Sequence, residues 1–231
     1  MDAVIATLFQ EGKYEKLLKT YEKNGGGVGY VALYFVAISY LFQEGFDEGK
    51  SLLIRLKKDR NSLPDYGCYL ALAHLRRGEY KQAKRAIDQV TTKSMLYFET
   101  NIEISIKLGQ VRRTMRLIRE SKSLNLVSPS IEINDAIIQM HRRQLKIAEK
   151  ILLRLLSTDP SNIAICDNLI RIYSNTRSGA KSECLLNEFL KCRPDHVPYL
   201  WQLVSIYSAQ GRYKEMSTLL KKIKRFKNVD G

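Results

Sequence analysis

The chain has 231 residues, of which 45% are hydrophobic, and a formal net charge of +14 at pH 7. No stretch reaches the roughly 20 apolar residues that a membrane span needs, and the first residues lack the basic and then apolar order of a secretory signal. The charge is compatible with a nucleic acid, an anionic membrane surface or an acidic protein as partner. Four cysteines show neither metal-ligand spacing nor a C-x-x-C motif, which favours reduced thiols in a cytoplasmic protein.

Two short helices are predicted first, over residues 2–11 and 14–23, followed by a glycine-rich joint at residues 24–29. The joint is not expected to be a phosphate-binding loop, because no Gly-Lys-Ser/Thr follows it and no strand precedes it. The next predicted helix, over residues 30–43, is apolar on every side and must therefore be covered on every side. Either neighbouring helices cover it, or a second molecule docks on it.

Further helices are predicted over residues 46–60 and 65–77, and a short turn recurs between the helices. Its glycines, at positions 12, 45, 78 and 109, lie 33, 33 and 31 residues apart, and steps of 34 then lead to Arg143, Arg177 and Gly211. We expect the glycine to let the backbone leave one helix with positive φ. Two residues later, an aromatic or aliphatic side chain is expected to begin the next helix.

A second pattern lies in the helix that follows each turn, where a small or apolar residue precedes a larger one by four positions. The pairs are Leu17/Tyr21, Ala83/Ile87, Thr114/Ile118, Ala148/Leu152 and Met216/Leu220. Pro160 and Pro194 each lie seventeen residues after a turn. A period of this size is typical of helical-repeat solenoids. The pattern resembles the tetratricopeptide-repeat (TPR) family over nearly the whole chain.

The resemblance implies an all-α fold, a right-handed α-solenoid of about seven helix-turn-helix repeats in one superhelical domain over residues 1–231. Within it, residues 1–29 would form a capping repeat with the glycine-rich joint, and residues 30–93 would form repeats two and three. Residues 94–128 would form a shortened repeat four. Residues 129–231 would form strict 34-residue repeats and a basic last helix.

TPR first helices line a concave groove, in which an asparagine commonly clamps the backbone of an extended peptide. The position resembling it reads Val36, Tyr69, Thr100, Asn134, Asn168 and Gln202. Amides donate and accept hydrogen bonds, as a peptide backbone requires. The resemblance thus predicts a polar groove made by Asn134, Asn168, Arg171, Asn175 and Gln202. An apolar groove is predicted at Phe35, Val36, Phe42, Tyr69 and Leu72, for an apolar helix or a second copy of the chain. The open alternative is that the amides only solvate the wall.

Basic residues gather instead on the second helices, which face outward in this architecture. The predicted surface for an anionic partner is made by Arg112, Arg116, Arg119, Arg143 and Lys146. The alternative is a solvated face without a partner. The basic rows contain few aromatic residues, which disfavours single-stranded nucleic acid as the ligand.

No catalytic or metal site and no cofactor are expected. The three histidines, His74, His141 and His196, are not paired at ligand spacing with another His, Cys or carboxylate. The function predicted is therefore a non-catalytic, cytoplasmic scaffold or adaptor that holds a segment of a partner protein in its groove. Resemblance to TPR proteins of secretion, pilus or envelope-polysaccharide machines suggests an assembly role. The alternative is a helical-repeat protein that binds RNA or another polyanion through its basic rows.

Overall fold

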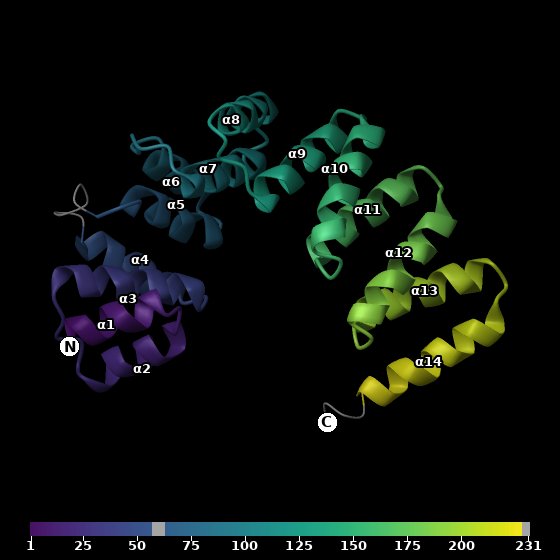
Figure 1. Cartoon of the computed structure of the whole chain (residues 1–231), viewed down its shortest axis with the longest axis horizontal. Coiled ribbons are helices and arrows are strands. Elements are labelled where there is room, and N and C mark those ends of the chain that lie inside the picture. The colour runs from purple at the N-terminus through teal and green to yellow at the C-terminus, as the bar shows by residue number, and fades with distance from the viewer. Residues whose placement is uncertain (57–62, 228–231) are drawn as a thin grey trace. The chain divides into compact units, whose positions relative to one another are not determined.

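The computed structural model of the chain describes residues 1–56 and 63–227. Over these residues it contains fourteen α-helices and no strand (Figure 1), which confirms the all-α prediction. Most of the helices pack against the next along the chain, in antiparallel pairs. Their bounds are α1 Asp2–Gln10, α2 Tyr14–Lys23, α3 Tyr30–Phe42, α4 Phe46–Arg55, α5 Tyr66–Arg76, α6 Tyr80–Ile87, α7 Met95–Lys107, α8 Val111–Ser123, α9 Pro129–His141, α10 Leu145–Thr158, α11 Ile163–Asn175, α12 Gly179–Cys192, α13 Val197–Ala209 and α14 Tyr213–Lys227.

The chain divides into two compact units, unit 1 from Met1 to Ile131 and unit 2 from Glu132 to Gly231. Unit 1 contains α1 to α8, unit 2 contains α10 to α14, and the boundary falls within α9. The helix predicted over residues 46–60 ends at Arg55 as α4, and residues 57–60 lie outside the described part of the chain. None of the described helices is both long and apolar enough to cross a bilayer.

The two helices of each pair are joined by the same turn. At Gly78 the backbone has φ +73°, and the next amide, that of Glu79, donates to the His74 carbonyl at 2.9 Å, as in a Schellman motif. The Tyr80 amide then donates to the Gly78 carbonyl at 3.0 Å, closing a γ-turn. The left-handed residues of the seven turns are Gly12, Glu44, Gly78, Gly109, Arg143, Arg177 and Gly211. The 34-residue step thus located turns at Arg143 and Arg177 where no glycine marks them.

In the second repeat the predicted turn residue is wrong by one position. Glu44 has φ +62°, whereas Gly45 has φ −76° and is the residue that precedes α4. The register of this repeat therefore begins one residue earlier than the glycine indicates. The small and large pair of α4 is Gly49 and Leu53, and Phe35 rather than Val36 is the equivalent of Tyr69.

Small residues lie where two helices approach closely. Ala83 and Ala148 are fully buried, as the sequence pattern predicts for this position. At Gly49 a Cβ atom would lie 2.9 Å from the Ala37 carbonyl oxygen, so α4 rests almost directly on the α3 backbone. The apolar helix α3 is covered by α1, α2 and α4. Val31 and Phe42, near its two ends, remain 58% and 50% exposed.

Candidate partner-binding surfaces

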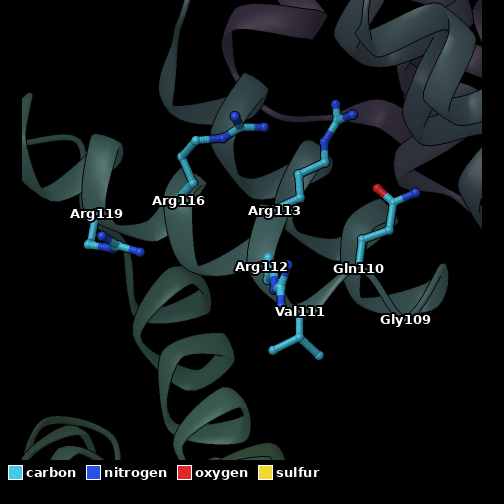
Figure 2. A pocket seen from close by; sticks show the side chains of 7 residues that line it. All are labelled: Gly109, Gln110, Val111, Arg112, Arg113, Arg116 and Arg119. Carbon is cyan, nitrogen blue, oxygen red and sulfur yellow. The ribbon is translucent and has the colours of Figure 1, made fainter.

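A surface cavity of about 770 Å³ lies along the start of α8 in unit 1 (Figure 2). Three of its arginines, Arg112, Arg116 and Arg119, are exposed and lie at i, i+4 and i+7, so they share one face of the helix. We call these three residues the arginine row. The full lining is Gly109, Gln110, Val111, Arg112, Arg113, Arg116 and Arg119.

Arg113 differs from the arginine row because it is held by neighbouring helices. Its guanidinium donates to Asp88 Oδ1 at 2.5 Å and to Asn101 Oδ1 at 3.0 Å. In the row, Arg119 Nε donates to the Met115 carbonyl at 3.3 Å. Over the described residues, none of the three arginines of the row has an ion pair. Their charge is thus available to a ligand.

Arg143 and Lys146, the other two residues predicted for an anionic partner, belong to unit 2. Arg143 is the left-handed residue of the turn between α9 and α10, with φ +61°. Lys146 lies in the first turn of α10, and both side chains are exposed. They therefore belong to the surface of unit 2, whereas the arginine row belongs to the surface of unit 1.

The predicted polar groove residues all lie in unit 2. Asn168 of α11 is nearly buried, and its Nδ2 donates to the Ala164 carbonyl at 2.8 Å. Its Oδ1 accepts a hydrogen bond of 3.4 Å from Arg171, which is exposed. Asn168 therefore uses its amide to position Arg171. Asn175, one helical turn beyond Arg171, is exposed.

Asn134 of α9 and Gln202 of α13 are half-buried. Gln202 Oε1 is buried and has no hydrogen-bond partner over the described residues. The preceding residue, Trp201, is 45% exposed. It is the single tryptophan of the chain, and an exposed tryptophan is often an energetically dominant contact in protein interfaces. Trp201 is not among the binding residues predicted from the sequence, although its rarity and its position beside Gln202 are signals that the sequence contains.

The predicted apolar groove residues all lie in unit 1, and aromatic contacts fix three of them. Phe35 stacks on Phe9 with ring centroids 4.5 Å apart, and Phe42 stacks on Tyr14 at 4.7 Å. Tyr69 makes an edge contact with Tyr34, and Leu72 is half-buried against the core of α5 to α7.

Val36 is fully buried and belongs to the core, a consequence of the one-residue shift in this repeat. It is therefore not available to a partner. That an apolar helix or a second copy of the chain binds the remaining four residues, Phe35, Phe42, Tyr69 and Leu72, stays a prediction.

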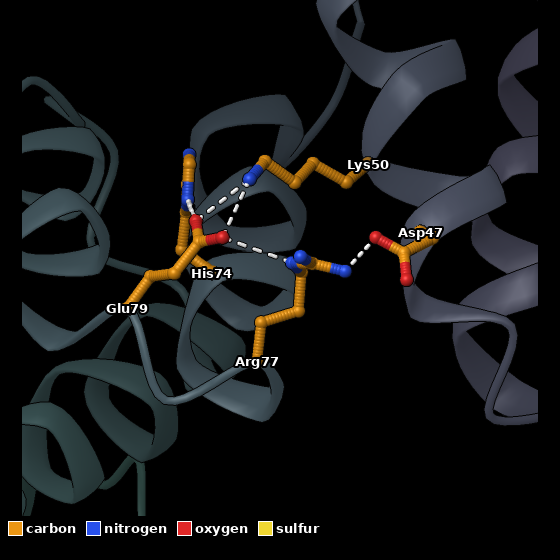
Figure 3. A network of polar contacts seen from close by, with 5 residues as sticks. All are labelled: Asp47, Lys50, His74, Arg77 and Glu79. Carbon is orange, nitrogen blue, oxygen red and sulfur yellow. Dashed lines mark hydrogen bonds and ion pairs between the residues drawn. The ribbon is translucent and has the colours of Figure 1, made fainter.

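A network of charges surrounds Glu79 in the turn between α5 and α6 (Figure 3). Its carboxylate accepts hydrogen bonds from Lys50 Nζ at 2.7 and 2.8 Å and from Arg77 Nε at 2.9 Å, and it contacts His74 Nδ1 at 2.5 Å. Arg77 also pairs with Asp47. The bonds from Lys50, Arg77 and His74 lower the pKa of Glu79 to about 2. Because Lys50 and Asp47 come from α4, the network ties two repeats together.

Two of the four cysteines, Cys68 and Cys166, are buried, and Cys184 and Cys192 are exposed. Burial raises the pKa of Cys68 to about 12 and that of Cys166 to about 11, which keeps both thiols protonated. The described part of the chain contains no group of three His, Cys, Asp or Glu side chains that could hold a metal ion.

No protein-family model and no curated protein sequence matches the chain. Solved structures do match. A chain of the APC/C hetero-tetramer Cut9-Hcn1 is 16% identical with a TM-score of 0.72, over 96% of this chain and 45% of that one. The chain thus spans less than half of that relative.

Two smaller proteins match along most of their own length. A thermophilic TPR protein of Thermus thermophilus is 13% identical, with a TM-score of 0.64 over 77% of this chain and 98% of that one. YrrB, described as a TPR protein with an unusual peptide-binding site, is 14% identical, with a TM-score of 0.55 over 80% and 95%. At these identities the likeness concerns the fold, and the chain has the helical-repeat fold of the tetratricopeptide-repeat proteins.

Proposed function

We propose that the chain is a protein-interaction module that holds a segment of a partner protein against the first helices of unit 2. The fold supports this proposal, since paired helices stacked in repeats present extended surfaces rather than a single enclosed site. YrrB, which shares the fold, is described as having a peptide-binding site. The proposal assigns this chain a scaffold or adaptor role without catalysis, and an assembly setting in secretion, pilus or envelope polysaccharide stays a prediction.

The observation that carries the proposal is the state of Arg171. Its guanidinium is exposed, is positioned by Asn168, and has no carboxylate partner over the described residues. In other repeats, by contrast, Arg76 pairs with Glu103 at 2.8 Å and Arg212 with Glu183 at 2.7 Å. An oriented arginine without an acid suits a carboxylate of the bound segment, because its planar fork matches that group.

Asn175 and Trp201 complete the proposed surface. Asn175 follows Arg171 by one helical turn and offers an amide to a peptide backbone. Trp201 offers an exposed aromatic face to an apolar side chain. Together they describe a ligand that is an extended segment with a carboxylate near an apolar residue.

The test begins with selection of peptides from a displayed random library on the wild-type chain. The Kd of the selected peptides is then measured by fluorescence anisotropy for the wild type, for Arg171→Glu and for Trp201→Ala. Each substitution is expected to weaken binding about tenfold or more, since a hydrogen bond to a charged group contributes roughly 1.5–3 kcal/mol and a dominant interface tryptophan about 2 kcal/mol or more. Lys224→Glu, at an exposed lysine of α14, changes the net charge as Arg171→Glu does and should leave the Kd unchanged.

Equal affinities for all four proteins, with unaltered thermal melts, would contradict the assignment of the binding surface to unit 2. Failure to select any peptide above background would count against the proposed function itself.

A further inference from the structure

We propose that the arginine row of α8, Arg112, Arg116 and Arg119, docks an acidic helical segment of a partner protein. This second surface belongs to unit 1 and does not rest on the residues proposed for unit 2. The cavity of about 770 Å³ beside the row gives such a segment room. Four observations support this proposal. The helix α8 is firmly anchored, and the chain does not neutralise the charge of the arginine row. The spacing of the three arginines matches that of carboxylates on a partner helix, and the residues that line the cavity suit a protein ligand.

The helix that carries the row is firmly anchored. Thr114, Leu117 and Ile118 on its opposite face are buried. Arg113 connects it to Asp88, directly after α6, and to Asn101 of α7. The backbone that positions the row is therefore fixed before any ligand arrives, which reduces the entropy lost on binding.

The charge of the row is not neutralised by the chain itself. Glu120 is the only acidic residue of α8, and it pairs with Lys93. Arg112 and Arg116 have neither an ion pair nor a side-chain hydrogen bond over the described residues. A partner that supplies carboxylates would therefore make new charge-assisted hydrogen bonds without breaking existing ones.

The spacing of the row matches a helix. At 1.5 Å per residue, Arg112 and Arg119 lie about 10 Å apart along the axis, which is also the separation of carboxylates at i and i+7 of a partner helix. Arg116 lies between them and can meet a carboxylate at i+4. A ladder of three ion pairs between two helices is thus geometrically available.

The lining of the cavity favours protein over nucleic acid. None of its seven residues is aromatic, whereas surfaces for single-stranded nucleic acid usually stack bases on aromatic rings. Val111, 39% exposed at the start of α8, supplies instead an apolar contact of the kind that protein interfaces use.

The experiment uses the full chain and a fluorescein-labelled, alanine-based helical peptide with glutamates at i, i+4 and i+7. Anisotropy titrations compare the wild type with Arg112→Glu/Arg116→Glu. The control, Lys16→Glu/Lys23→Glu, changes the net charge equally at two exposed lysines of α2. The arginine variant is expected to weaken binding about tenfold or more and the control to have little effect. Arg112→Ala/Arg116→Ala, which adds no repulsion, should fall between them.

Three outcomes would overturn the proposal. Equal weakening in both charge-reversed proteins would show that only net charge matters. Equal binding of a peptide with glutamines in place of the glutamates would show that the carboxylates do not contribute to recognition. Tight binding of an oligouridylate that the arginine variant abolishes, without binding of the acidic peptide, would assign the row to nucleic acid.

Discussion

Lys50 donates from Nζ to both carboxylate oxygens of Glu79, at 2.7 and 2.8 Å. This contact links α4 to the turn that precedes α6. Unit 2 contains the same link with the charges exchanged. There Glu183 of α12 accepts from Arg212, the residue before α14, at 2.7 Å. Lys50 and Glu183 both lie six residues after a left-handed turn residue, and Glu79 and Arg212 both lie directly after one. The contact is thus a recurring joint between repeats.

We predict that Glu79→Gln destabilises the chain by on the order of 1–2 kcal/mol, because the carboxylate and its three partners are mostly screened from water. Chemical denaturation at pH 7 measures this change. Glu15→Gln is the control, since Glu15 pairs with Lys19 where both side chains are 73% exposed, and it should leave the midpoint unchanged.

The pH dependence follows from the lowered pKa of Glu79. Its value is about 2 in the folded chain against 4.5 ordinarily. The ionised carboxylate therefore contributes its full stabilisation above about pH 4.5, and this contribution is lost as the pH falls toward 2. The stability difference between wild type and Glu79→Gln should shrink over that interval. A constant difference would contradict the assignment.

Ala83→Leu should destabilise the chain by about 1–3 kcal/mol, because Ala83 is fully buried where α5 and α6 cross. A fall in Tm measured by circular dichroism checks this expectation. Ala180→Leu, on an exposed position of α12, is the matched control and should melt like the wild type. An unchanged Tm for Ala83→Leu would mean that the repeat register is wrong.

The turn residues should respond to substitution with opposite signs. Gly109 has φ +68°, and no atom lies within 4 Å of the position that a Cβ methyl would occupy, so Gly109→Ala should cost about 1 kcal/mol from backbone conformation alone. Arg143→Gly relieves a left-handed arginine and should raise the stability slightly, by a few tenths of a kcal/mol. Gly179→Ala, at the start of α12 with ordinary φ, should not destabilise. Destabilisation in Arg143→Gly would argue against strain at this turn.

The thiols should fall into two kinetic classes toward a thiol-specific reagent such as Ellman's. Cys184 and Cys192 are exposed and should react rapidly in the native chain. Cys68 and Cys166 are buried, and their raised pKa values keep them protonated, so they should react only on unfolding. In Cys184→Ser/Cys192→Ser the rapid phase should vanish. A rapid phase that persists in this variant would show that a buried site opens.

Most of the fold could be predicted from the sequence, because the turn and the small residue after it recur at nearly fixed spacing. The step of 34 found the turns at Arg143 and Arg177 without a glycine to mark them. The glycine marker failed in the second repeat, where Glu44 has the positive φ although the adjacent Gly45 is by intrinsic preference the better candidate for it. Burial of Leu53 and close contact at Gly49 decided the register instead, and these are tertiary effects.

The candidate surfaces were predicted less completely. The arginine row was visible as basic residues at helical spacing, but the link of Arg113 to Asp88 and Asn101 depends on packing between helices. The glycine at position 45 predicts a groove position for Val36, but the repeat begins one residue earlier and Val36 is buried. The sequence predicts Asn168 as a groove residue, and in the structure its amide bonds to Ala164 and Arg171, contacts that no spacing in the sequence reveals.

The exchanged charges of the two joints have a consequence for how the repeats could be rearranged. If the helix pair that carries Glu79 were grafted after the one that carries Glu183, two carboxylates would meet at the seam. Arg212 placed beside Lys50 would likewise bring two cations together. The charges of these two contacts therefore favour the present order of the helix pairs over the exchanged one.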